Sequence, residues 1–202
     1  MANNSDTLTD FANLFGSIDK QQIYGLGLSV PESARDVFKP WDQRDDTSKF
    51  VESGVDDQLI IHVAFNESVR IKSIFFKIGR GEVAPQHLDI FANHPTIVDF
   101  SDAENIKPQL SIALQTGESD VVEYPVRVAT FPSVTTLSLF FKDSEGGDTS
   151  RVYYIGFKGD IRSARTPASS GLEVPAEGSA EAQLLDRIKS RIGGTSQQTT
   201  AR

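Results

Sequence analysis

Residues 58–78 read QLIIHVAFNESVRIKSIFFKI, and this stretch decides the fold class. Its first part has apolar side chains at every second position, and the residues between them point the other way. A period of two is that of a β-strand, whereas an amphipathic helix repeats every 3.6 residues. The stretch therefore predicts β-structure. The side chains expected on one face of the strand are Leu59, Ile61, Val63 and Phe65.

The polar residues 66–68 predict a turn, after which residues 69–78 return as a second strand. Within that strand the apolar face shifts by one position near Ser73, so that Ile74 and Phe76 continue it. A shift of one residue is typical of a β-bulge or a bend. We therefore expect the second strand to be irregular.

Other short apolar runs follow, separated by turn residues. Pro125 lies inside one of them and predicts an edge strand or a bulge, because proline cannot donate a hydrogen bond to a neighbouring strand. Seven or eight short strands without helices between them predict an all-β sandwich or barrel in one domain. The further strands are expected at residues 87–92, 110–114, 121–129, 136–142 and 151–159.

Helices are expected only at the two ends of the chain. Residues 6–15 predict a short amphipathic helix that docks onto the domain, with Leu8 and Phe11 on its apolar face. The glycines, prolines and turn residues of 16–46 indicate an irregular stretch. Residues 179–192 predict a second amphipathic helix.

The composition changes after residue 161 to a linker rich in Ser, Ala, Pro and Gly. We therefore expect three parts. They are a helical extension at 1–17, the β-sandwich at 18–161, and a flexible tail at 162–202 that carries the second helix.

The composition excludes several classes of function. The 202 residues carry a net charge of −8, which disfavours binding to nucleic-acid phosphates. There is no cysteine, so disulfides, thiolate metal sites and thiol redox chemistry are excluded. The apolar runs are too short to span a membrane, and the sequence MANNSDTLTDF lacks the features of a secretory signal. We expect a cytoplasmic and nuclear protein that is monomeric.

No catalytic or metal site is predicted. The histidines His62, His87 and His94 are scattered and have no metal-binding spacing. No nucleophile elbow, phosphate-binding loop or dinucleotide fingerprint is present. Acid pairs such as Asp45–Asp46 are more often found in turns and caps than in catalysis. We therefore expect no enzymatic activity and no cofactor.

Two features are candidates for binding a partner. The loop DSEGGD contains Asp143, Glu145 and Asp148, and three interpretations apply to it. It can hold calcium, contact a partner, or turn a hairpin between residues 136–142 and 151–159 with its glycines at positive φ, and the hairpin is favoured because the spacing is not that of an EF-hand.

Trp41, the only tryptophan, has two interpretations. It plugs the core, or it forms an exposed binding hot spot together with Arg44, since Trp and Arg are enriched at interface centres.

The stretch VFKPWDQRDDTSKFVESGVDDQLIIHVAFNESVRIKSI at 37–74 resembles the opening of the PITH domain, the proteasome-interacting module of thioredoxin-like proteins. The resemblance continues through PQHLDIFANHPTIVDFSDAENIKPQLSIAL at 85–114 and ends in FPSVTTLSLFFKDSEGGDTSRVYYIGFKG at 131–159. No CxxC motif is present, and only about 17 residues precede the match. The chain is therefore similar to the stand-alone branch of this family, whose members have no thioredoxin domain.

The resemblance implies a jelly-roll β-sandwich akin to galactose-binding-like domains, without enzymatic activity. It also implies association with the regulatory particle of the proteasome. The alternative is a jelly-roll domain that binds a small ligand or carbohydrate. The apolar stripe of the predicted helix at 179–192 either packs on the sandwich of the same chain or enters a groove of a partner. For the second case, the candidate partner-binding residues of this helix are Leu184, Leu185 and Ile188.

Overall fold

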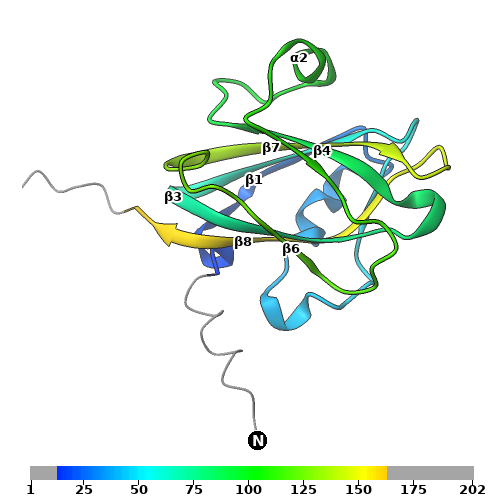
Figure 1. Cartoon of the computed structure of the whole chain (residues 1–202), viewed down its shortest axis with the longest axis horizontal. Helices are drawn as coiled ribbons and strands as arrows, with labels where there is room; N and C mark the ends of the chain where they lie inside the picture. Colours follow the sequence, from blue (N-terminus) through cyan, green and yellow to red (C-terminus); the bar gives the residue numbers. More distant parts are fainter. Residues whose placement is uncertain (1–12, 163–202) are drawn as a thin grey trace, which may run out of the picture. The chain divides into compact units, whose positions relative to one another are not determined.

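β-strands dominate residues 13–162, the part of the chain that the structure, a computed structural model, describes (Figure 1). In chain order the strands are β1 (Ile18–Leu26), β2 (Val51–Glu52), β3 (Leu59–Ile78), β4 (Pro85–Ala92), β5 (Leu110–Ala113), β6 (Val122–Pro125), β7 (Val134–Ser144) and β8 (Arg151–Ile161). The helical segments are the 3₁₀ turns η1 (Phe15–Ser17), η2 (Pro31–Val37), η3 (Trp41–Gln43) and η4 (Gly81–Val83), and the α-helix α2 (Phe100–Asn105).

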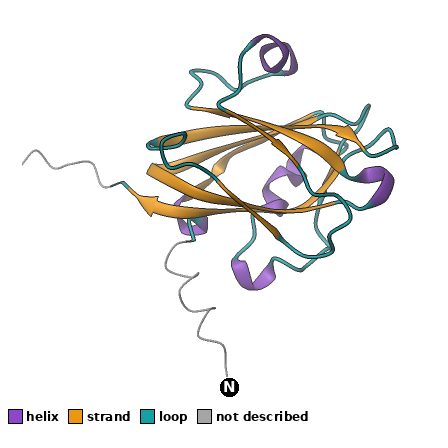
Figure 2. Ribbon diagram, viewed as in Figure 1, coloured by secondary structure: helices purple, strands orange, loops and turns teal. Residues whose placement is uncertain are grey.

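β3 belongs to both layers of the sandwich. Its residues 59–65 pair with β1 and β7, whereas residues 69–78 pair with β8 and, in part, with β6, always antiparallel. Val69, where the strand changes layer, also pairs with Val134 of β7. The first layer is completed by β4 and β5 beside β7, and the second by β2 beside β8. Figure 2 shows these two layers, connected by loops and short helical segments. The all-β sandwich that the sequence predicts is therefore confirmed.

The turn predicted at residues 66–68 is wrong. These residues continue β3, and the two halves of the strand do not pair with each other. The register against β7 shifts between Ala64 and Val69, where the strand passes from one layer to the other. The bulge predicted near Ser73 is confirmed, because the register against β8 shifts between Ile71 and Ser73.

The main core lies between the two layers. The four side chains predicted on one face of β3 all belong to it, and Phe76 meets Phe141 edge to face with ring centroids 5.6 Å apart. The opposite face of the first layer is also apolar, because Ile60 and Phe140 form a second cluster with residues around α2. Figure 1 shows α2 outside the strands β4 and β7.

The hairpin predicted between residues 136–142 and 151–159 is also wrong. β7 pairs with β3 and β4, whereas β8 pairs with β2 and β3, so the loop between them connects the two layers. The predicted edge strand is confirmed, because β6 ends at Pro125 and pairs only with β3. The stretch 16–46 is not wholly irregular, since it contains β1.

The connection between β4 and β5 contains α2, which the sequence analysis did not predict. Asp99 caps this helix by accepting a hydrogen bond from the Asp102 backbone N–H at 2.8 Å, and the Asp102 side chain accepts one in return. This reciprocal capping box explains why a helix of six residues forms here.

The predicted terminal helices fall mostly on residues that the structure does not describe. Of the helix predicted at 6–15, only residues 13–15 are described, and they are not α-helical: Asn13 bridges to Lys158 and Phe15 begins η1. The helix predicted at 179–192 lies wholly outside the described residues. Within residues 13–162, no helix has the length and apolar character needed to span a membrane.

Candidate functional site

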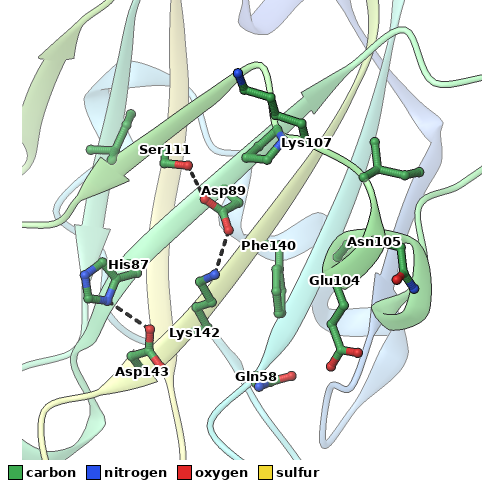
Figure 3. Close-up of a pocket in the computed structure, with 14 residues that line it drawn as sticks. Gln58, His87, Asp89, Glu104, Asn105, Lys107, Ser111, Phe140, Lys142 and Asp143 are labelled. Carbon is green, nitrogen blue, oxygen red and sulfur yellow. Dashed lines mark hydrogen bonds and ion pairs between the residues drawn. The ribbon is translucent and has the colours of Figure 1, made fainter.

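A concave site of about 890 Å³ lies on the outer face of the first layer, beside α2 (Figure 3). Strands β4, β5 and β7 form its floor, and the end of α2 with the residues that follow forms a wall. Leu88 and Ile90 of β4 point into the main core, so the alternation of the strand directs His87 and Asp89 outward into the site.

We call this concave site the polar pocket. Asp89 lies at its centre, with 11% of its side chain exposed. Lys142 Nζ of β7 donates to its Oδ2 at 2.7 Å, and Ser111 Oγ of β5 donates to its Oδ1 at 2.5 Å. Each carboxylate oxygen therefore has a donor from a different neighbouring strand. These bonds compensate for the loss of solvent around the Asp89 carboxylate. They also connect side chains of the three strands β4, β5 and β7.

His87 and Asp143 form a second pair at the rim of the polar pocket. The distance from His87 Nδ1 to Asp143 Oδ2 is 2.9 Å, and both side chains are about half exposed. Asp143 has φ of 59°, in the left-handed region that aspartate tolerates better than most residues. The pair thus forms where the chain turns sharply near the end of β7.

Acids and a histidine converge in this pocket, and their side chains are bonded to neighbouring residues. The Asp89 oxygens already accept bonds from Lys142 and Ser111. In residues 13–162, no hydroxyl nucleophile hydrogen-bonds to His87, and no group of three or more acids and histidines is arranged to hold a metal ion. The polar side chains that line the pocket are hydrogen-bonding groups that a ligand or a partner could contact.

A second hollow, the Trp41 cleft, has a volume of about 500 Å³. Trp41 of η3 packs edge-on against Phe75 and Tyr154, with ring centroids 5.1 and 6.4 Å apart. Phe75 and Tyr154 alternate with core residues of β3 and β8, so Trp41 covers the outer face of the second layer. Burial raises the pKa of Tyr154 to about 12, against the opposing effect of the nearby Arg44 charge, so its hydroxyl stays neutral.

Arg44 completes the cleft. The centre of its guanidinium lies 4.4 Å from the centroid of the Trp41 ring, and its Nη1 donates to the Trp41 carbonyl oxygen at 2.9 Å. This combines a cation–π contact with a hydrogen bond that fixes the side chain. The structure therefore brings together Trp41 and Arg44, the two residues that the sequence analysis paired.

Lys39 holds the loop that carries Trp41. Its side chain is 5% exposed, and its Nζ donates to the carbonyl oxygens of Asp46 at 2.6 Å and Lys49 at 2.8 Å. Burial lowers the pKa of Lys39, and the nearby carboxylates of Asp46 and Asp36 oppose this shift. The loop is thus closed by one buried cation rather than by regular secondary structure.

The acidic loop after β7 is held by its backbone. The Glu145 N–H donates to the Ala84 carbonyl and the Gly147 N–H to the Glu82 carbonyl, both at 3.0 Å. A Cβ atom on Gly147 would lie 2.6 Å from the Glu82 oxygen, so only glycine fits this close approach.

The glycines of this loop do not have the positive φ that the hairpin interpretation requires. In this loop, positive φ is found at Asp143 and not at Gly146 or Gly147. The loop is consequently a pinned connection between layers, with Glu145 and Asp148 exposed on its surface.

The predicted partner-binding residues therefore do not form one patch. Trp41 and Arg44 lie on the outer face of the second layer, and Asp143 lies at the rim of the polar pocket on the first. Three further candidates, in the predicted C-terminal helix, lie outside the described residues: Leu184, Leu185 and Ile188.

The sequence analysis did not identify the polar pocket. Its central residues Asp89, Ser111 and Lys142 come from three strands that are far apart in the sequence. The available signal was a charged residue at an outward position of an otherwise apolar strand, as in HLDIFA. Only the strand register shows that these residues meet.

Comparison with solved structures agrees with this architecture. The CBM32-1 and CBM32-2 domains of Clostridium perfringens ZmpB in complex with GalNAc match with a TM-score of 0.57 and 17% identity, over 79% of this chain and 39% of that one. CBM32-3 from a family 31 glycoside hydrolase of the same organism matches with a TM-score of 0.53 and 8% identity, over 79% and 100%. At such identities the likeness shows the fold alone, a galactose-binding-like jelly roll.

Comparison of sequences shows the family. The PITH domain CG6153 protein of Drosophila melanogaster is 34% identical over 152 residues, which cover 75% of this chain and 71% of that protein. PITH domain-containing protein 1 of Danio rerio is 34% identical over 151 residues, with the same coverage. The model of the PITH domain family matches residues 4–176, and at the family level this supports a protein-interaction module. The chain belongs to the PITH domain family.

Proposed function

We propose that this chain is a non-enzymatic protein-interaction module that associates with the regulatory particle of the proteasome in the cytoplasm and nucleus. Membership of the PITH family, the proteasome-interacting module of thioredoxin-like proteins, carries the proposal. The pairing within the polar pocket supports the non-enzymatic part, because His87 pairs with Asp143 and the Asp89 carboxylate is held by Lys142 and Ser111.

The Trp41 cleft is the surface that we assign to the partner. Tryptophan and arginine are enriched among the residues that dominate binding energy at interface centres. Trp41 is half-buried against Phe75 and Tyr154, and Arg44 is fixed on its face. Both side chains are therefore ordered before binding, so little conformational entropy is lost when a partner contacts them.

Binding of a small ligand or carbohydrate is the second candidate, and the polar pocket favours it. Its hydrogen-bonding groups suit hydroxyls, and its fold neighbours include a carbohydrate-binding module with GalNAc bound. Neither Phe140 in the polar pocket nor Trp41 in its cleft offers an open aromatic face for stacking a sugar, however. Phe140 on the floor is 4% exposed, and Arg44 lies over the ring of Trp41.

The test is capture of purified proteasome regulatory particle by the full-length chain at near-physiological salt. Arg44→Glu should reduce capture by at least about tenfold, which corresponds to about 1.4 kcal/mol, below the usual contribution of a hot-spot residue. Lys107→Glu is the matched control, because it reverses an exposed positive charge in the polar pocket on the other layer.

If the wild-type chain retains no regulatory-particle subunits while a known proteasome binder does, the proposal is wrong. If only Lys107→Glu abolishes capture, the partner uses the polar pocket instead of the Trp41 cleft. A rise in melting temperature with galactose or GalNAc, together with failed capture, would support the carbohydrate candidate.

A further inference from the structure

Strand β1 forms one edge of the first layer. Within residues 13–162 it pairs only with β3, so the backbone groups on its other side have no strand partner there. In an antiparallel pair, residues alternately direct their N–H and C=O groups toward the neighbouring strand and away from it. An edge of this kind can accept a further strand, and most proteins protect such an edge with charges, bulges or a cover.

Only the first half of this edge is protected. The register against β3 shifts between Asp19 and Ile23, and the residues at 19–22 read DKQQ and are mostly exposed. Residues 23–26, in contrast, read IYGL, carry no charge and pair with β3 in continuous register. A bulge and charged side chains hinder pairing with another chain, so the open part of the edge is its apolar half.

A groove of about 370 Å³ runs along the open half of β1. Its inner wall is η2, whose buried residues Ala34 and Val37 belong to the main core. Its outer wall is Ile97, whose neighbour Val98 belongs to the second cluster beside α2. The open edge therefore lies between two walls, and its four strand residues span about 13 Å.

The two walls differ in chemistry. On the outer side, Tyr24 and Ile97 are large apolar residues that are 45% and 40% exposed. On the inner side, η2 presents Glu32 and Arg35, which are exposed and form no ion pair with another residue of 13–162. An extended segment directs successive side chains to opposite sides. The complementary segment therefore has apolar side chains toward the outer wall and charged side chains toward η2.

We propose that the groove along residues 23–26 binds an extended segment of a partner protein, which adds a strand to β1 and alternates apolar with charged residues. In this mode main-chain hydrogen bonds provide affinity and the alternating side chains provide specificity. The two walls admit a single extended segment, whereas β1 of a second copy would bring its own walls with it. The groove shares no lining residue with the Trp41 cleft, so it is a second interaction surface and does not depend on the proposed function.

The first test selects ligands from a displayed library of random linear peptides, with the full-length chain as the target. Ile97→Lys should weaken binding of the selected peptides by at least about tenfold, because it replaces the apolar outer wall with a charge. Val128→Lys is the matched control, since Val128 is 41% exposed but lies in the loop after β6. Circular dichroism shows that both variants remain folded. The proposal is wrong if no selected peptide is weakened by Ile97→Lys more than by Val128→Lys.

The second test changes the peptide and leaves the protein intact, so it stays informative if Ile97→Lys disturbs folding. Methylation of one peptide nitrogen at a time removes one backbone donor at a time. In a strand added to β1, every second residue donates to β1, so methylation should weaken binding by at least about tenfold at alternate positions and have little effect between them. Equal losses at every position, or no loss at any, would overturn the proposal.

The last outcomes concern other occupants of the edge. In the free full-length protein, the outward amides of residues 23–26 should exchange their hydrogens rapidly, and a bound peptide should slow them. Slow exchange in the free monomer would show that another segment of the same chain covers the edge. Protection that increases with protein concentration would show that a second copy does. Either result would overturn the assignment to a partner.

The peptide measurements also separate this surface from the Trp41 cleft. Arg44→Glu, which alters the cleft, should leave peptide binding unchanged, because Arg44 does not line the groove. Loss of peptide binding in Arg44→Glu would place the peptide in the Trp41 cleft and overturn the proposal. None of these measurements needs the proteasome, so they succeed or fail independently of regulatory-particle capture.

Discussion

The outer faces of the two layers are covered in different ways. On the first layer, α2 and the residues around it cover Ile60 and Phe140, so the apolar surface there is a second cluster beneath a capped helix. On the second layer, the side chain of Trp41 covers Phe75 and Tyr154, and it comes from a loop held by the buried Lys39.

The difference shows what each kind of cover leaves exposed. The helical cover buries its aromatic floor, and polar side chains that bond to one another surround it. The single-residue cover leaves its own ring half-exposed, with an arginine fixed on it. An aromatic and a guanidinium that are held in place but remain accessible suit protein recognition, which is why we assign the partner to the second layer.

The largest expected effect is on the helical cover. Phe140→Ala should lower the free energy of unfolding by about 3–5 kcal/mol, because it removes a buried aromatic ring from the cluster beneath α2. Urea denaturation measures the loss, and Phe140→Leu, which keeps most of the apolar volume, should lose less. A loss below about 1 kcal/mol would show that the α2 cover adds little to stability, and the contrast between the two faces would fail.

The loop cover should respond to loss of its buried cation. Lys39→Met keeps the length of the side chain but leaves the carbonyls of Asp46 and Lys49 without their donor, and should cost about 2–4 kcal/mol. Trp41 emission should also move to longer wavelength, because the loop that positions the ring loosens. Lys39→Arg retains a cation and should lose less. Unchanged emission in Lys39→Met would show that packing alone holds Trp41.

The sequence predicted the strands better than their partners. The alternation in QLIIHVAF correctly assigned both faces of β3, because side-chain direction is a local property. The path of the strand, in contrast, is not a local property. Polar residues such as 66–68 are expected in a turn, and they are equally expected at an exposed bend where one strand passes between layers. The same ambiguity produced the wrong hairpin between β7 and β8, since adjacent strands in the sequence can enter different layers.

The candidate site residues likewise divide into those that the sequence identified and those that it did not. Trp41 and Arg44 were identified because they are close in the sequence and chemically distinctive. Asp89, Ser111 and Lys142 were missed because they meet only through the pairing of β4 with β5 and β7. The helix α2 had a readable signal in Asp99 and Asp102, three residues apart, but it was treated as part of a long connection.

The two faces should also differ in their response to acid. His62 lies on the outer face of the first layer, hydrogen-bonded to Ser138, and burial lowers its pKa below the ordinary value of 6.5. Between that lowered pKa and 6.5 the unfolded chain binds more protons than the folded chain, so stability falls as the pH decreases through this window and levels off below it.

The slope for one group is at most about 1.4 kcal/mol per pH unit. Urea denaturation of wild type and His62→Gln at pH 7.5 and 5.5 measures it, since other titrating groups contribute to both proteins. The wild type should lose more stability than His62→Gln on acidification. Parallel losses would show that His62 is not the group that couples this face to pH.

The loop that connects the two layers carries three acids, Asp143, Glu145 and Asp148, and their substitution should affect stability to different, smaller extents. Asp143 has positive φ and pairs with His87, so Asp143→Ala should cost about 1 kcal/mol, and Asp143→Gly should cost less because glycine tolerates this backbone. Thermal denaturation of the two variants provides the comparison. Equal losses would assign the effect to the missing carboxylate rather than to the backbone.

Glu145 and Asp148 give the smallest expected effect. Their side chains are exposed, and the loop is held by backbone N–H groups and by the close approach of Gly147 to Glu82, which alanine at these two positions leaves in place. The double variant Glu145→Ala with Asp148→Ala should therefore stay within about 0.5 kcal/mol of wild type. Its capture of the regulatory particle should also be unchanged, since the Trp41 cleft is untouched. A loss of capture with intact stability would move the partner surface to this loop and away from Trp41.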